Sequence, residues 1–230
     1  MKKLLIAAII LAGVSCMPLQ AADAAAKDQK DPLNEWTFFQ LGFWFDAPSY
    51  TKTSNVYFLK LGCPTCSGLG RVKGNELAIF WAGTDYVEGL QSSFIVCENR
   101  KIDGVQASAG FCQSRETMNG LQACGGVNMS GTTNGFQPGA LNIAGDVNGL
   151  QMAATTTICK DINGAQFSFV NYSKKLNGFQ ASVVNMADGG NGVQLGVVNI
   201  TNKRGIQFGL VNYIKDGWVP FIPLFNISWK

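Results

Sequence analysis

The sequence predicts an all-β protein, a repeat β-solenoid of about eleven coils of 13–16 residues with aromatic caps. A phrase that opens with glycine recurs along the chain, for example at residues 178–185, 192–199 and 205–212. Within each copy, apolar and polar residues alternate with the period of a β-strand. Short polar segments that end in Asn-Gly or Asp-Gly separate the copies and are typical of turns. Repetition, alternation and turn chemistry therefore agree on one stacked unit.

Each position of the repeat, counted from the opening residue, follows a rule. Position +2 is Gln in nine consecutive copies, position +4 is always small, and Asn recurs near the end of the strand. We expect the large apolar residues at +1, +3 and +5 to form the buried column. We expect the glutamines to bond along the stack, where they either display a weakly charged face to a partner or simply satisfy their neighbours in the stack and bind nothing. This candidate interaction ladder comprises Gln91, Gln106, Gln122, Gln137, Gln151, Gln166, Gln180, Gln194 and Gln207.

An antiparallel outer-membrane β-barrel is the alternative architecture. Each unit is long enough for one membrane-spanning strand and a turn, and charged residues make up only 14% of the chain. Three features favour the solenoid. The turns do not alternate between short and long, Asn falls at the same end of every strand, and most units carry no aromatic girdle. Pro138 is awkward in both architectures, because proline donates no hydrogen bond to a neighbouring strand.

The ends of the chain differ from the repeats. Residues 1–21 read as a signal peptide, with Lys2 and Lys3 before a short apolar run and small residues near position 21. Cys16 offers a lipidation site as a rival interpretation of this segment. Residues 22–35 read as a mobile leader, and residues 36–55 as an N-terminal capping strand and turn rich in aromatic residues. The β-repeat array spans residues 56–216, and residues 217–230 form a C-terminal cap.

Six cysteines follow the predicted signal peptide, and an even number in an exported chain suggests disulfides. Cys97 and Cys112 occupy the same phase of consecutive copies, so a bridge could join neighbouring coils. Two small buried apolar side chains would explain the same pattern. Cys63 and Cys66 have the spacing of a redox motif, but no βαβ pattern surrounds them, and they join the candidate disulfide set.

The composition gives no sign of catalysis. The chain has no histidine, which removes the usual general base and the commonest metal ligand. The aspartates at positions 146, 161, 188 and 216 fall in different phases and form no recurring acid pair. We therefore expect no enzyme activity, no cofactor and no metal site. A formal charge of +3 also gives no reason to expect a nucleic-acid partner.

The phrase Gly-apolar-Gln-x-Gly-apolar-Val-Asn at residues 192–199, and the ending at residues 220–226, resemble an uncharacterised bacterial family of surface repeat-containing proteins. Cys97 and Cys112 depart from this pattern by replacing the Asn. The resemblance implies an exported protein of the outer membrane, the cell surface or the periplasm, and implies no catalytic residue. We expect a structural or interaction role in the cell envelope, with an envelope protein, a host surface protein or a second copy as partner. Membrane association, as a pore or anchor, belongs to the barrel alternative.

Overall fold

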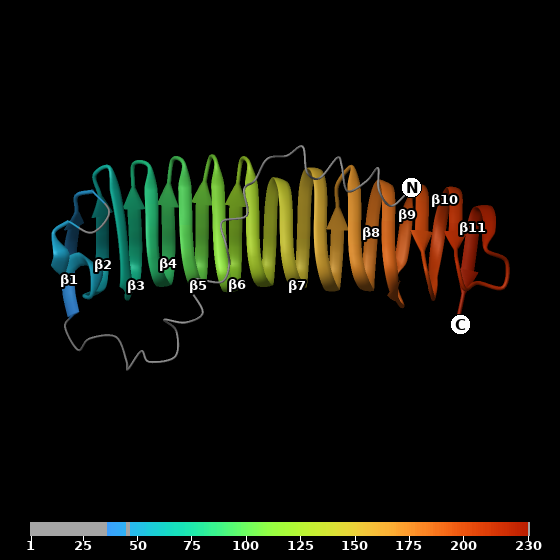
Figure 1. Ribbon diagram of the computed structural model, residues 1–230, viewed down its shortest axis with the longest axis horizontal. Helices are drawn as coiled ribbons and strands as arrows, with labels where there is room; N and C mark the ends of the chain where they lie inside the picture. Colours follow the sequence, from blue (N-terminus) through green and yellow to red (C-terminus); the bar gives the residue numbers. More distant parts are fainter. Residues whose placement is uncertain (1–35, 45–46, 230) are drawn as a thin grey trace. The chain divides into compact units, whose positions relative to one another are not determined.

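The computed structural model describes residues 36–44 and 47–229, and the part of the chain that it describes is a β-solenoid of about twelve turns. Strands follow one another in chain order along the stack (Figure 1). The predicted all-β solenoid is thereby confirmed. The predicted signal peptide, Cys16 and the leader lie outside the described residues.

Eleven strands and one short 3₁₀ helix make up the described chain. The N-terminal elements are β1 (Trp36–Gly42), η1 (Ser49–Lys52), β2 (Asn55–Gly62), β3 (Thr65–Ala78), β4 (Trp81–Ser93), β5 (Val96–Ser108) and β6 (Phe111–Cys124). The C-terminal elements are β7 (Val127–Phe167), β8 (Val170–Gly190), β9 (Val193–Thr201), β10 (Gly205–Ile214) and β11 (Phe221–Ser228).

Successive coils pair in parallel, with like residues in register. Gly89 pairs with Gly104 and Gln91 with Gln106, and this correspondence continues along the stack. Among the strands of the described residues, only β11 runs antiparallel, against β10. The parallel pairing contradicts the barrel alternative, in which neighbouring strands would alternate in direction.

The opening glycine of each coil has a steric reason. Gly89 has φ +136° and Gly120 has φ +116°, a backbone conformation that residues with a side chain rarely adopt. A Cβ atom at Gly89 would lie 2.1 Å from the carbonyl oxygen of Gly74 in the preceding coil. The opening glycines from Gly74 to Gly178 therefore form a column in which the backbones of successive coils approach too closely for any side chain.

The core is mainly polar, and this corrects the predicted apolar column at +1, +3 and +5. Fully buried positions are the Gln at +2, the Asn near the strand end, and, in most coils, the residue two before the opening glycine, such as Ile102 or Ile162. The large side chains at +3 and +5, such as Leu195 and Val197, are exposed. An amide can be buried here because the coils above and below offer it both a donor and an acceptor.

Candidate interaction surface

The nine glutamines of the predicted interaction ladder lie inside the solenoid and bond to one another. From Gln106 onward, each side-chain Nε2 donates to the Oε1 of the glutamine one coil earlier, over 2.6–2.9 Å. Eight of the nine have no exposed surface, and Gln194 is 2% exposed. We call this row the glutamine ladder. The prediction that it forms a docking face is wrong, because its amide groups bond within the stack and do not reach the surface.

The glutamine ladder begins on a buried charged cluster. Gln91 Nε2 donates to Glu76 Oε2 over 2.8 Å, so a carboxylate occupies the first acceptor position. Thr84 Oγ1 donates to Glu76 Oε1 and accepts from Lys60 Nζ at 2.8 Å, which links the two charges. Lys60 and Glu76 are at most 1% exposed. Gly68 leaves room for the ammonium, since a Cβ there would lie 2.8 Å from Lys60 Nζ.

A second buried row, the interior asparagine ladder, lies across the core. Asn171 donates to Asn185, Asn185 to Asn199, and Asn199 to Asn212, over 2.8–3.0 Å. Asn128 donates to Asn142 in the same direction. Thr157 stands between these two runs and donates its hydroxyl to Asn171. This ladder therefore points toward the C-terminus and is interrupted once.

A third row lies on the surface beside the opening glycines, and we call it the exterior asparagine ladder. Each Nδ2 donates to the amide oxygen one coil earlier, and Asn119 at its beginning donates to the Asp103 carboxylate. Its other bonds measure 2.8–3.2 Å. The members are Asn119, Asn134, Asn148, Asn163 and Asn177. As with the glutamine ladder, the first acceptor is an acid.

In most coils, large apolar side chains gather at the bend between the two buried ladders. Residues 79–80, 94–95 and 168–169 lie at such bends, between one strand and the next. We call the positions +3, +5 and +6 of the coils the apolar edge. Its exposed members are Leu77, Ile79, Phe80, Phe94, Ile95, Met152, Phe167, Phe169, Val183, Leu195, Val197, Phe208, Leu210 and Val211.

The charged residues lie at the other bend of each coil, the charged edge. In the ten coils that open at residues 74–205, the run from the opening glycine to the asparagine position holds one charged residue, the buried Glu76. Ion pairs such as Arg71–Glu88 at 3.4 Å and Arg100–Glu116 at 3.6 Å lie on the charged edge. The described solenoid is therefore amphipathic from one edge to the other.

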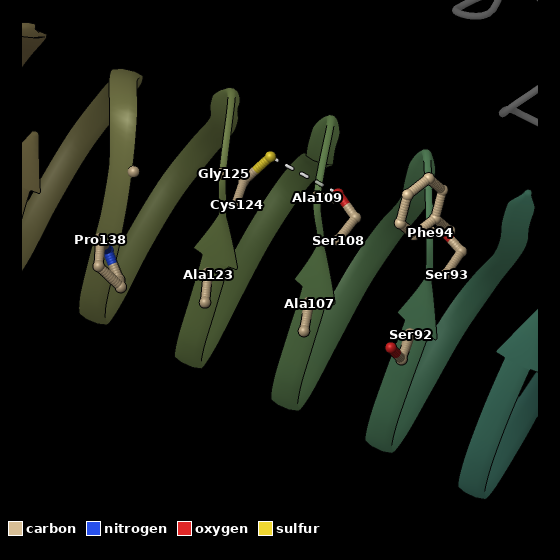
Figure 2. A pocket seen from close by; sticks show the side chains of 11 residues that line it. Ser92, Ser93, Phe94, Ala107, Ser108, Ala109, Ala123, Cys124, Gly125 and Pro138 are labelled. Carbon is tan, nitrogen blue, oxygen red and sulfur yellow. Dashed lines mark hydrogen bonds between the residues drawn. The ribbon is translucent and has the colours of Figure 1, made fainter. Parts of the chain in front are cut away.

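A shallow hollow of about 500 Å³ interrupts the apolar edge. Figure 2 shows small side chains of three consecutive coils on its floor, including Ala107 and Ala123. Phe94 and Pro138 stand at its two ends. Pro138 thus occupies an outward position, where its side chain lies on the surface and its carbonyl accepts from Asn128.

The six cysteines of the described chain are free thiols, so the predicted disulfides among Cys63, Cys66, Cys97 and Cys112 are absent. Cys97 and Cys112 do lie in register. Their thiols donate instead to the carbonyl oxygens of Ala107 and Ala123. Burial, followed by the nearby Glu76 carboxylate, raises the pKa of the Cys66 thiol, which donates to that carboxylate over 3.3 Å.

Burial raises the pKa of Cys159 to about 12, so this thiol is also held in its neutral form. Within residues 36–44 and 47–229, no cluster of three or more acidic, cysteine or histidine side chains could hold a metal ion. No helix in the described part of the chain is long and apolar enough to cross a membrane.

Comparison with known proteins found no family model that matches the chain, and no significantly similar curated protein or solved structure. The candidate surface must therefore be judged from its own chemistry.

Proposed function

We propose that the protein is an exported structural or interaction protein of the cell envelope, and that its apolar edge contacts the lipid surface of a membrane. The observation that carries this proposal is the separation of an apolar edge from a charged edge. Exposed apolar surface on this scale is unusual for a soluble monomer and marks an interaction site.

The form of the edge favours lipid as the occupant. Phe94, Phe169 and Leu210 project from the bends of their coils and are 68%, 59% and 63% exposed. Projecting side chains enter a fluid acyl layer readily, whereas a protein partner would need a matching groove. The backbone groups are paired between successive coils and the amide side chains within the buried ladders, so contact with lipid leaves both satisfied.

Vesicle flotation tests the proposal. The full chain should float with phosphatidylcholine vesicles, and Phe169→Lys combined with Leu210→Lys should weaken this binding at least tenfold. Each of the two apolar side chains contributes about 1.5–3 kcal/mol to the free energy of binding when it enters the apolar phase, and lysine at its position removes this contribution. Asn191→Lys with Asn202→Lys adds the same charge to the charged edge and should leave flotation unchanged.

A second copy is the competing occupant of the apolar edge. Sedimentation without lipid separates the two outcomes, with circular dichroism as the check of folding. A dimer that the edge variant dissociates, together with no flotation of the wild-type chain, would overturn the lipid proposal. Equal loss of flotation in both variants would show that added charge, and not the apolar edge, controls binding.

A further inference from the structure

Every member of the exterior asparagine ladder is followed directly by the opening glycine of its coil. Asparagine before glycine is the residue pair most prone to deamidation, because glycine has no side chain to hinder attack by its own backbone nitrogen. A sixth pair, Asn191 and Gly192, occupies the same position of the next coil. The six pairs share one chemistry, so differences in their reactivity must come from the fold.

The fold holds the first five pairs in an unreactive arrangement. Each of these asparagine side chains donates to an oxygen one coil earlier. The glycines are paired as well, Gly120 with Gly135 and Gly164 with Gly178. Attack requires the glycine nitrogen to reach bonding distance of the asparagine side-chain carbon, and the hydrogen bonds of the stack oppose this rotation. A pair in the ladder therefore reacts only after its coil opens.

A column of buried side chains, two residues before each opening glycine, supports these coils. Its last members are Val147, Ile162 and Leu176, which are at most 2% exposed. Gly190 takes the next place, with φ +117° and no side chain. Leu176 packs against Gly192 instead, since a Cβ there would lie 2.2 Å from Leu176 Cγ. The sixth asparagine therefore lies where the supporting column ends.

Asn191 lies outside the strands, between β8, which ends at Gly190, and β9, which begins at Val193. Its side chain is exposed and has no hydrogen-bond partner within residues 36–44 and 47–229. In the same part of the chain, the backbone amide of Gly192 donates to no carbonyl oxygen. The two groups that must meet in deamidation are thus both free of the bonds that hold the other five pairs.

We propose that Asn191 is a site of spontaneous deamidation, and that the exterior asparagine ladder and the paired coils protect the other five pairs. This inference is independent of the proposed function. The Gly192 nitrogen loses its proton to solvent and attacks Asn191 Cγ. The new bond closes a five-membered succinimide, and the side-chain nitrogen takes up a proton and leaves as ammonia. One water molecule then opens the ring at either carbonyl and leaves aspartate or isoaspartate.

The surroundings of Asn191 accommodate both products. A carboxylate there adds a negative charge to the charged edge, where Lys203 and Arg204 follow in the next coil. Lys203 lies against this segment, since a Cβ at Gly189 would be 3.5 Å from Lys203 Cδ. Isoaspartate lengthens the main chain by a methylene group, but between two strands and not within one. The modified chain should therefore keep its fold, which circular dichroism can check.

Peptide mapping by mass spectrometry tests the proposal on the full, unmutated chain. The folded protein is kept in mildly alkaline buffer and digested at mildly acidic pH, which limits deamidation during digestion. Asn191 should convert at least about tenfold faster than Asn134, Asn148 or Asn163, because those three must first leave paired coils. Both aspartate and isoaspartate should form at residue 191. Direct hydrolysis of the amide would give aspartate alone and would overturn the succinimide route.

The same chain unfolded in urea provides the control. Without the stack, the six asparagine–glycine pairs should convert at similar rates. Equal conversion of Asn191 and the ladder asparagines in the folded chain would overturn the proposal. So would an advantage of Asn191 that persists in urea, because local sequence and not the fold would then explain it.

Discussion

The glutamine ladder and the interior asparagine ladder share one core, yet their amide groups point in opposite directions along the stack. Each glutamine donates to the preceding coil, as Gln180 does to Gln166. The interior asparagines before Asn212 donate to the following coil, as Asn185 does to Asn199. The two side chains differ by one methylene group, so their opposite directions must come from their surroundings.

The backbone sets the direction of the asparagine ladder. Asn171 Nδ2 also donates to Ala181 O, and Asn185 Nδ2 donates to Leu195 O, in each case a carbonyl of the next coil. The NH₂ group must face those carbonyls. Its oxygen is then left to accept from the preceding coil.

An acid at one end sets the direction of the glutamine ladder. Glu76 carries only acceptors when ionised, so the neighbouring Gln91 must present its NH₂ group, and every later glutamine follows. The exterior asparagine ladder begins on Asp103 and runs the same way. At the other end, Gln207 Oε1 has no partner among the described residues. A single carboxylate thus orients a whole row of amides.

Replacing Glu76 should have the largest effect on the free energy of unfolding. Glu76→Gln places an NH₂ group among the donors Gln91, Thr84 and Cys66, and it leaves Lys60 without a countercharge. Breaking a buried charge pair costs about 3–5 kcal/mol. We expect a loss of that size in the free energy of unfolding, measured by urea denaturation and circular dichroism.

The partner residue provides the control for this prediction. Lys60→Met alone should also destabilise the fold, and Lys60→Met with Glu76→Gln should lose less than the sum of the two single variants. Full stability of Glu76→Gln would contradict the view that the acid orients the ladder.

Interrupting the glutamine ladder should have the next largest effect. Gln166→Leu leaves Gln151 Oε1 without its donor and Gln180 Nε2 without one of its acceptors. Each unsatisfied buried group costs about 1–3 kcal/mol. The free energy of unfolding should fall accordingly. Gln113→Leu changes a half-buried glutamine outside the ladder and should alter stability by no more than about 0.5 kcal/mol. Equal effects of the two substitutions would refute a role for the ladder.

The smallest effect on stability is expected from a substitution in the exterior asparagine ladder. Asn163→Ala removes two bonds of the exterior asparagine ladder, with Asn148 and Asn177. Water can replace these bonds, so the loss should stay below about 0.5 kcal/mol. Thermal unfolding of Asn163→Ala beside Gln166→Leu measures the difference between an exposed and a buried ladder. A loss as large as that of Gln166→Leu would show that exposure does not matter here.

The sequence predicted the fold better than it predicted the surface. Regular spacing of Gly, Gln and Asn was enough to predict stacked coils and pairing of like residues, as for Gln91 with Gln106. The side of the strand that faces inward was predicted wrongly. Alternation of apolar and polar residues shows that a strand has two different faces, but it does not show which face is buried. We assigned the apolar face to the core, and this placed Leu195 and Val197 inside and Gln194 outside.

The buried charged cluster and the hollow were missed as sites. Lys60 and Glu76 stand at position +2 of their copies, where later copies have Gln. This departure from Gln is visible in the sequence and could have indicated the charged cluster. The hollow had a weaker signal, the replacement of Phe94 by Ala109 and Gly125 at the same position of later coils.

The sequence by itself determined the repeat, its period and the column that each residue joins, because like residues of stacked parallel coils must lie in register. Only the tertiary structure decided that the amides are the interior and the large apolar side chains the exterior. The physical reason is that a buried amide is costly in one coil alone, but in a stack each coil supplies the donor or acceptor that its neighbour needs. That exchange is a property of the assembled coils, and no single repeat contains it.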